Sequence, residues 1–270
     1  MPIDKIVKEK SKYYPASNKP TKLRNIAADI LRSNSNTVEV EFVSGNSNPQ
    51  ENTLKLYPKD SLYIYRRYKK SDDKSYKMLD NNIGYVTLQS IKGEDISNIK
   101  NEFKDTKGII IDIRNYPSTF VPFSLGSYFV SSSTPFVKFS KGNVDNPGEF
   151  TFSNNLVIPS QGKTYNGKLV VLVNELSQSQ AEYTSMAFRA GDNTTIIGST
   201  TAGADGNVSA IMLPGGLRTM ISGIGVYYPS GEETQRVGIV PDVEVHPTIE
   251  GIREGKDELL EKAIEIIVKE

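Results

Sequence analysis

The feature that most constrains this fold is a pair of nearly continuous apolar, largely β-branched runs at residues 109–113 and 169–173. Strands with one solvated face alternate apolar and polar residues. Runs like these are instead typical of strands buried on both faces, as in a parallel sheet covered by helices. Two further apolar runs, at 83–88 and 193–199, have the same texture. We therefore predict that a parallel sheet forms the centre of the fold.

Helical patterns lie between the predicted strands. Candidate helices cover 94–104, the neighbourhood of 120–131, and 179–190. Strands that alternate with helices along a chain indicate an α/β fold. Near the C-terminus, Leu259, Ala263 and Ile267 recur at helical spacing, so we expect this last helix to dock on the core.

The first part of the chain has a different pattern of apolar residues from the α/β core. Residues 3–7 and 22–33 repeat apolar residues at helical spacing, and residues 37–58 read as two alternating strands around a Gly/Asn/Pro turn. The predicted organisation has four parts. They are an α+β subdomain at 1–58, a charged, tyrosine-rich connecting segment at 59–83, the α/β core at 84–250 and a C-terminal helix at 251–270.

Composition excludes several classes of partner and site. Lys+Arg and Asp+Glu both total 32, so no net charge would attract nucleic acid or an anionic membrane. With no cysteine and a single histidine, the chain has no disulfide, no thiolate metal site and no histidine-rich metal site. We expect neither a metal nor an organic cofactor.

The beginning of the chain bears on export. Its first residues are charged and lack the apolar core of a signal peptide, and no run approaches ~20 apolar residues. We expect the chain as written to be soluble and unexported. Because it opens directly into an amphipathic helical pattern, we also expect the natural gene product to be longer.

Ser179 lies where a predicted strand ends and the helix at 179–190 begins. Catalytic groups of open α/β sheets gather at the carboxyl ends of strands, and a helix N-terminus offers free N–H groups to an oxyanion. A structural interpretation competes, because Ser179 with Glu182, and Ser177 with Gln180, both form capping boxes. The spacing does not decide which serine caps the helix and which one reacts.

The stretch around Ser179 resembles the nucleophile region of the C-terminal processing, or tail-specific, serine peptidases and of their tricorn-type relatives. Their pattern is an apolar strand, a Ser-x-Ser-x-x-Glu stretch, a helix, and a strand ending in Gly-x-x-Thr-x-Gly. Gly198, Thr201 and Gly203 match the last element. The resemblance implies that Ser179, three residues before the glutamate, is the nucleophile.

A second block, GIIIDIRNYPST, resembles the family's Asp-Leu-Arg-Gly-Asn-x-Gly-Gly. It supplies Asp112 and Arg114, but Ser118 and Thr119 stand where the family has paired glycines. By this resemblance, the backbone N–H of Ser118 or Thr119 would join that of Gln180 as oxyanion donors. For Asp112 and Arg114 we favour a structural role, in which the pair braces the turn after the strand.

A third block at 227–248 resembles the family's ending, since Gly238, Pro241 and Asp242 match Gly-Val-x-Pro-Asp. The resemblance covers roughly residues 84–250. It implies a ClpP/crotonase-like core of stacked β-β-α units. The helix and hairpin within 1–58 resemble the later part of a PDZ domain, so we expect a truncated PDZ-like subdomain before the core.

A serine hydroxyl becomes a strong nucleophile only when a base takes its proton, and the sequence does not identify that base. The Ser-Lys branch of the family has a lysine where this chain has Ala204. The tricorn-type branch uses a histidine from a separate N-terminal segment. We interpret His246 as a strand-end residue, Asp205 as a turn residue and Glu233 as solvent-facing. Gln235 is a candidate orienting partner, and we expect the base itself to lie upstream of this sequence.

These patterns predict a serine endopeptidase that hydrolyses peptide bonds of proteins or peptides through an acyl-enzyme on Ser179. The alternative is a catalytically silent protein that keeps the peptidase fold as a peptide-binding or scaffolding module. Acyl-CoA chemistry on the crotonase fold is disfavoured, because a serine at the helix start and the Pro-Asp block are peptidase features. The resemblance implies a periplasmic or cell-envelope location if an upstream export signal exists, and a homo-oligomer stays open.

Overall fold

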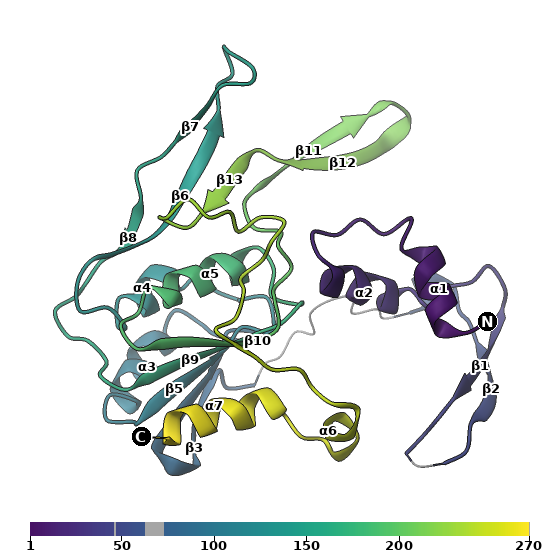
Figure 1. The fold of residues 1–270 in the computed structure, drawn as a ribbon, viewed down its shortest axis with the longest axis horizontal. Helices are drawn as coiled ribbons and strands as arrows, with labels where there is room; N and C mark the ends of the chain where they lie inside the picture. Colours follow the sequence, from purple (N-terminus) through teal and green to yellow (C-terminus); the bar gives the residue numbers. More distant parts are fainter. Residues whose placement is uncertain (46, 63–72, 270) are drawn as a thin grey trace.

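Figure 1 shows the computed structural model of the protein, which describes residues 1–45, 47–62 and 73–269. Its centre is a six-stranded sheet with the order β14-β10-β9-β5-β4-β3. The strands are β3 (Tyr76–Leu79), β4 (Ile83–Thr87), β5 (Gly108–Asp112), β9 (Lys168–Val173), β10 (Thr194–Gly198) and β14 (Val243–Glu244). All neighbours run parallel except β3, which is antiparallel to β4. The predicted parallel sheet is confirmed.

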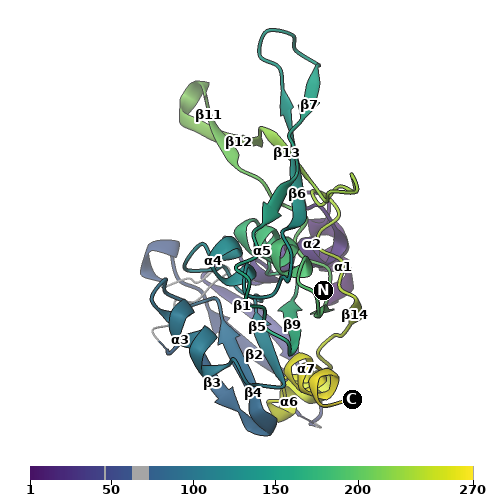
Figure 2. The ribbon, with the colours of Figure 1, turned by 90° about the vertical axis from the view of Figure 1, so that its left-hand side faces the viewer.

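Helices cover both faces of this sheet, which explains the continuous apolar runs. On one face lie α3 (Asp95–Glu102), α4 (Pro122–Gly126) and α5 (Gln180–Arg189), and on the other lies α7 (Glu258–Val268) (Figure 2). Along β5, Ile109 and Ile111 belong to the larger core under α3–α5, whereas Ile110 belongs to the smaller core under α7. Successive residues of a strand point to opposite faces, so both sets must be apolar.

The C-terminal segment docks on the sheet as predicted, although it forms two helices instead of one. α6 (Ile249–Glu254) ends at Gly255, which adopts a left-handed φ of +69°, a common end for a helix. α7 then packs across β5, β9 and β10. No helix in the described part of the chain combines the length and hydropathy of a membrane span.

The N-terminal segment contains the helices and hairpin predicted from its periodicity. α1 (Ile3–Lys10) and α2 (Lys19–Ala28) precede the antiparallel strands β1 (Thr37–Phe42) and β2 (Gln50–Lys55). The predicted connecting segment at 59–83 lies partly outside the described residues. Its described part holds two 3-10 turns, at Lys59–Ser61 and Asp80–Asn82, and also β3. The main sheet therefore begins at Tyr76, ahead of the boundary expected at residue 84.

Two β-rich arms were not predicted. One contains β6 (Thr134–Gly142), β7 (Phe150–Phe152), β8 (Leu156–Ile158) and β13 (Ile224–Tyr227), and the other is a hairpin of β11 (Val208–Leu213) and β12 (Leu217–Ser222). Both arms project from the side of the core that carries α5 (Figures 1 and 2). β7, β8 and β13 have three or four residues each, and every residue of β11 and β12 is exposed. β6 has nine residues, but buried and exposed positions do not alternate along it, so its pattern is not that of a half-buried strand.

The packing of α7 generates a prediction about Gly108. A Cβ placed on Gly108 would lie 2.7 Å from three carbon atoms of Ile267. We predict that Gly108→Ala lowers the free energy of unfolding by about 1–3 kcal/mol, the usual effect of overpacking, as measured by urea denaturation. Gly93→Ala is the matched control, because a Cβ there meets no atom within 4 Å. Equal losses for the two variants would contradict tight docking of α7.

Candidate active site

Ser179 occupies a strained backbone conformation at the start of α5. Its φ is +56° and its ψ is −118°, a combination that residues with a side chain rarely adopt. Such conformations cost of order 1–3 kcal/mol, persist only where the surroundings enforce them, and cluster at functional sites. Ser179 also follows the carboxyl end of β9 and is partly exposed. Ser179 therefore lies beyond the carboxyl ends of the parallel strands, with its side chain partly exposed.

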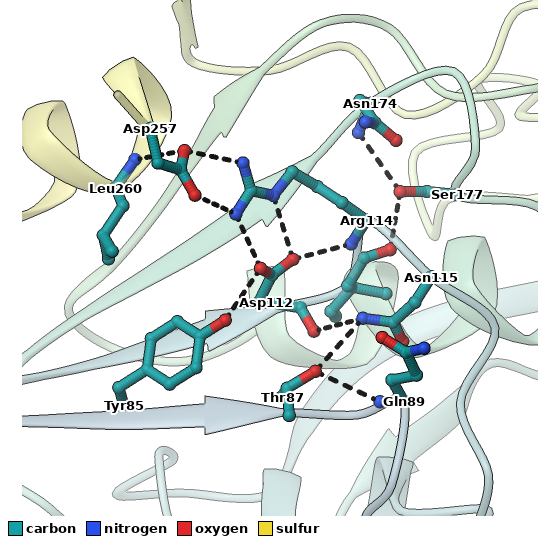
Figure 3. A network of polar contacts seen from close by, with 11 residues as sticks. Tyr85, Thr87, Gln89, Asp112, Arg114, Asn115, Asn174, Ser177, Asp257 and Leu260 are labelled. Atoms are coloured by element: carbon teal, nitrogen blue, oxygen red, sulfur yellow. Dashed lines mark hydrogen bonds and ion pairs between the residues drawn. The ribbon is translucent and has the colours of Figure 1, made fainter. Parts of the chain in front are cut away.

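The structure separates the two serines that the sequence could not distinguish. Ser177 is fully buried. Its hydroxyl donates to the carbonyl oxygen of Ile113 at 2.7 Å and accepts from the N–H of Asn174 at 3.2 Å. These bonds join the loop after β9 to the loop after β5 (Figure 3). Ser177 thus has a structural role, and Ser179 is the accessible serine of the pair.

Glu182 holds the strained conformation in place. Its carboxylate is fully buried and accepts four hydrogen bonds: from the N–H groups of Ser179 (3.0 Å), Ala204 (3.0 Å) and Gly203 (2.7 Å), and from the hydroxyl of Thr201 (2.6 Å). The bond from Ser179 is the glutamate half of the predicted capping box. Burial raises the pKa of Glu182, and the four hydrogen bonds oppose that rise.

The Gly-x-x-Thr-x-Gly motif supplies donors to Glu182 from the loop after β10. We call Glu182 together with its four donor groups the Glu182 cradle. Thr201 accepts a hydrogen bond from the N–H of Ile239 at 2.7 Å while donating to Glu182. At Gly198, whose φ is +127°, a Cβ would lie 1.9 Å from the carbonyl oxygen of Val173. Only glycine allows the backbone to pass there, which explains the motif's first position.

The structure brings two of the predicted oxyanion donors, Gln180 and Thr119, into contact and leaves the third, Ser118, with its N–H occupied. The Gln180 side chain donates to the carbonyl oxygen of Thr119 at 3.1 Å, so the turn after β5 meets the first turn of α5. First-turn N–H groups have no partner within their helix, which leaves the N–H of Gln180 available. The N–H of Ser118 instead donates to the carbonyl oxygen of Leu88 at 2.9 Å. Of the two residues proposed for the turn, Thr119 is therefore the better candidate.

Asp112 and Arg114 form the paired brace that we favoured, and the brace extends to α7 (Figure 3). Arg114 donates to both carboxylate oxygens of Asp112 at 3.0 and 2.7 Å, and to both oxygens of Asp257 at 2.8 and 2.7 Å. Asp257 in turn caps α7 by accepting from the N–H of Leu260 at 3.1 Å. The guanidinium of Arg114 thus connects the loop after β5 to α7, the helix on the face of the sheet opposite α3, α4 and α5.

The third sequence block is structural in this arrangement. The Gln235 side chain donates to the carbonyl oxygens of Asp205 (2.8 Å) and Ile224 (3.0 Å) and to the hydroxyl of Ser222 (3.1 Å). It therefore clamps the base of the β11–β12 hairpin instead of orienting a base beside Ser179. Asp242 accepts from the N–H of Ile196 at 2.7 Å, which fixes the chain to β10.

Neither His246 nor Asp205 is hydrogen-bonded to Ser179 in the described part of the chain. His246 is 60% exposed and pairs with Glu244 at 2.8 Å, as expected of a strand-end residue. Asp205 accepts from the N–H of Gly206 at 2.7 Å, but it is 6% exposed and its Oδ2 has no partner among described atoms. The described residues also contain no cluster of three His, Asp or Glu side chains suited to a metal.

Contacts from α2 complete the site, and the sequence did not predict them. Asn18 donates to the carbonyl oxygens of Thr201 (2.7 Å) and Val237 (3.2 Å). Arg24 donates to the carbonyl oxygen of Glu175 at 2.5 Å, in the loop that leads to Ser179. An asparagine before a helix is a common N-cap residue. Nothing in the sequence, however, indicates that Asn18 also binds the backbone of Thr201, 183 residues later. The N-terminal segment therefore supports both loops around the cradle.

Asp205 generates a prediction about pH. Burial and, second, the negative charge of Glu182 raise the pKa of Asp205 from 3.8 to about 7. The folded state therefore binds this proton more tightly than the unfolded state does. The resulting stabilisation is complete below about pH 4 and disappears as the pH rises through about 7. Asp205→Asn, which has no proton to lose, should resist unfolding better than wild type at pH 8 in urea titrations.

The control for this measurement is Asp145→Asn, which removes a carboxylate from an exposed loop. It should follow the wild-type profile between pH 4 and 8. A profile for Asp205→Asn that parallels wild type across the same range would contradict the raised pKa of Asp205.

Comparison with known proteins agrees with this geometry. The model of peptidase family S41 matches residues 82–245, more than half of the 270-residue chain. A protein of Parabacteroides merdae ATCC 43184, to which peptidase activity has been ascribed, is 22% identical with a TM-score of 0.65, covering 99% of this chain and 89% of its own. Mature CPAF complexed with lactacystin is 15% identical with a TM-score of 0.68, covering 87% and 68%.

At such identities these structures establish the mixed α/β fold alone. No curated protein sequence matches the chain significantly. The family match carries the identification, because it spans the strained serine, the Glu182 cradle and the sheet that positions them. The chain belongs to peptidase family S41, and its function is that of a serine peptidase.

Proposed function

We propose that this peptidase cleaves proteins or peptides through an acyl-enzyme on Ser179. The observation that carries the assignment to this residue is its left-handed backbone, enforced by a buried carboxylate at a helix N-terminus. Capping alone does not require that strain, since an N-cap residue normally adopts an extended backbone. A site that needs its hydroxyl turned outward does require it.

In the proposed reaction, the Ser179 hydroxyl oxygen attacks the carbonyl carbon of the scissile bond while its proton passes to a general base. The negative charge that develops on the carbonyl oxygen is stabilised by the N–H groups of Gln180 and Thr119 and by the positive end of α5. The carbon–nitrogen bond then breaks, and the base returns the proton to the leaving amine. Water hydrolyses the acyl-enzyme and restores Ser179.

For the general base, we propose a histidine or lysine other than those placed by the described structure. His246 is engaged with Glu244, and no lysine occurs between Ser179 and Lys256. The tricorn-type arrangement, with a histidine from a separate N-terminal segment, is the version we favour. This arrangement requires that the histidine reach the hydroxyl of Ser179 from its solvent-exposed side, because Glu182 and its donors occupy the buried side.

We propose that an aromatic shelf beside the site receives an apolar substrate side chain. Phe120 follows Thr119, is 54% exposed, and stacks on Tyr183 of α5 with ring centroids 5.9 Å apart. Phe139 stacks on the same tyrosine at 6.4 Å. Burial and, second, the charge of Asp205 raise the pKa of Tyr183 to about 12, so its hydroxyl stays neutral at physiological pH.

The finer description of the fold is also a proposal. Two parallel strand–helix–strand units, β4-α3-β5 and β9-α5-β10, support a ClpP/crotonase-like core. The order of α2, β1 and β2 supports a truncated PDZ-like subdomain at 1–58. We propose a connecting segment that ends before β3, a catalytic core that begins at Tyr76 and extends to residue 250, and a C-terminal segment at 251–270. If the natural protein has an upstream export signal, the resemblance supports a periplasmic or cell-envelope location.

A fluorophosphonate probe tests the nucleophile directly. We predict that the probe modifies Ser179 in the full natural protein, that mass spectrometry finds the adduct on the peptide containing this residue, and that Ser179→Ala abolishes it. Ser177→Ala is the matched control and should keep the label while losing stability, because its hydroxyl makes two buried hydrogen bonds. Labelling of another serine in the folded protein would overturn the assignment.

The strain itself is testable apart from the chemistry. Glycine adopts positive φ without the steric cost of a Cβ. We predict that Ser179→Gly unfolds at a higher urea concentration than Ser179→Ala, by about 1–2 kcal/mol in free energy. A glycine variant that is no more stable than the alanine variant would show that the backbone of residue 179 is relaxed in solution.

A further inference from the structure

The turn at 117–120 makes side-chain contacts that a pair of glycines could not make. The hydroxyls of Ser118 and Thr119 both donate to the carbonyl oxygen of Ile91, at 2.6 and 2.8 Å. The N–H of Ser118 donates to the carbonyl oxygen of Leu88 at 2.9 Å. These bonds hold the turn against the loop that follows β4. Because glycine has no hydroxyl, the two bonds to Ile91 depend on the residues that stand here in place of paired glycines.

The same turn also docks on α5. The Gln180 side chain donates to the carbonyl oxygen of Thr119 at 3.1 Å. Phe120 stacks on Tyr183 with ring centroids 5.9 Å apart. Gln180 and Tyr183 are three residues apart, so they share one face of the helix. Two consecutive residues of the turn thus contact one face of α5, and the hydrogen bond from Gln180 is the contact next to Ser179.

Helix capping does not account for the Gln180 side chain. The sequence allows a capping box of Ser177 with Gln180, in which the glutamine would accept from the N–H of Ser177. In the structure that N–H donates to the carbonyl oxygen of Asn174 at 2.9 Å, and Glu182 binds the N–H of Ser179. The side-chain amide of Gln180 binds the turn outside its own helix instead. It therefore connects the two segments that carry the proposed oxyanion donors.

We infer that the Gln180 side chain is a positioning residue for the oxyanion donors, in place of a glycine pair in the turn. This role rests on the proposed function, because it concerns the same charge on the same carbonyl oxygen. The backbone N–H of Gln180 is one donor, and its side chain holds the residue that supplies the other. The N–H and the carbonyl of Thr119 lie on either side of one Cα. A bond that holds the carbonyl therefore restricts where the N–H points, since threonine has less freedom in φ and ψ than glycine.

The position of the Thr119 N–H matters because oxyanion stabilisation depends steeply on distance. Donors act when they lie ~2.7–3.1 Å from the oxygen of the transition state, and removing one donor slows the reaction ~10²–10³-fold. A misplacement of about 1 Å can cost ~100-fold. Of the two amides proposed for the turn, that of Ser118 is occupied by Leu88. The contribution of the turn therefore depends on how Gln180 holds Thr119.

The rate at which a fluorophosphonate modifies Ser179 in the full natural protein tests this role. Gln180→Met keeps the length of the side chain and removes its donor. We expect the maximal labelling rate, kinact, to fall about 10–100-fold, because the transition state loses a well-placed donor. The half-saturating probe concentration, KI, should stay within about twofold of wild type, as for an interaction made only in the transition state. Gln161→Met, the same change in an exposed loop, is the matched control and should label at the wild-type rate.

Phosphorus NMR supplies a readout that a purely structural role would not move. The phosphonyl oxygen of the adduct occupies the position of the oxyanion. In Gln180→Met we expect the adduct resonance to move from its wild-type position toward that of the unfolded adduct. Gln180→Glu is a second variant, because an ionised carboxylate of the same shape cannot donate but suits the first turn of a helix. It should fold and label at least as slowly as Gln180→Met.

The results separate this role from the proposed function. If wild type is labelled on Ser179 and folded Gln180→Met or Gln180→Glu labels with wild-type kinact and KI, the proposed function stands and the positioning role is overturned. A raised KI with unchanged kinact would also overturn it, because the side chain would then bind the probe and not position a donor. A folded wild type that is not labelled overturns the proposed function and the positioning role together.

Discussion

The carboxylate of Glu182 is the interaction on which the rest of the site depends. It lies in the core at 0% exposure and accepts from three backbone N–H groups and one hydroxyl. The donors come from two segments, the start of α5 and the loop after β10, so one side chain fixes their relative position. A buried carboxylate is costly unless its oxygens are satisfied, and here both oxygens accept two bonds each.

Glu182 and Asp205 show how differently two neighbouring buried carboxyl groups can behave. Glu182 accepts four hydrogen bonds, which oppose the rise in its pKa that burial causes. Asp205 receives one N–H bond from the adjacent residue, and its second oxygen has no described partner. Because the charge of Glu182 also disfavours a second negative charge nearby, the proton of Asp205 is the less costly one to retain. Local hydrogen bonding, more than residue type, thus distinguishes the two groups.

Much of the sheet and the place of Ser179 were predictable, because both depend on local patterns. The runs in β5 and β9 are apolar on both faces since helices cover both faces, and the serine lies in the short segment that joins β9 to α5. The discrimination between Ser177 and Ser179 was not predictable, because the partner of Ser177 is the carbonyl of Ile113, 64 residues earlier. The same holds for the N–H of Ser118, which is occupied by Leu88. The hairpin of β11 and β12 escaped prediction because its apolar residues are exposed, contrary to the usual meaning of such a run.

The contacts of α2 have a consequence for how the protein comes into being. Asn18 bonds to the carbonyl of Thr201, 183 residues later, and Arg24 bonds to that of Glu175, 151 residues later. Contacts of such sequence separation form late, because a long loop must close before they can stabilise anything. During synthesis, the first helices would wait until most of the chain had emerged before the loops around Ser179 could settle. The N-terminal support of the site can therefore form only after the segment from Glu175 to Val237 has been synthesised.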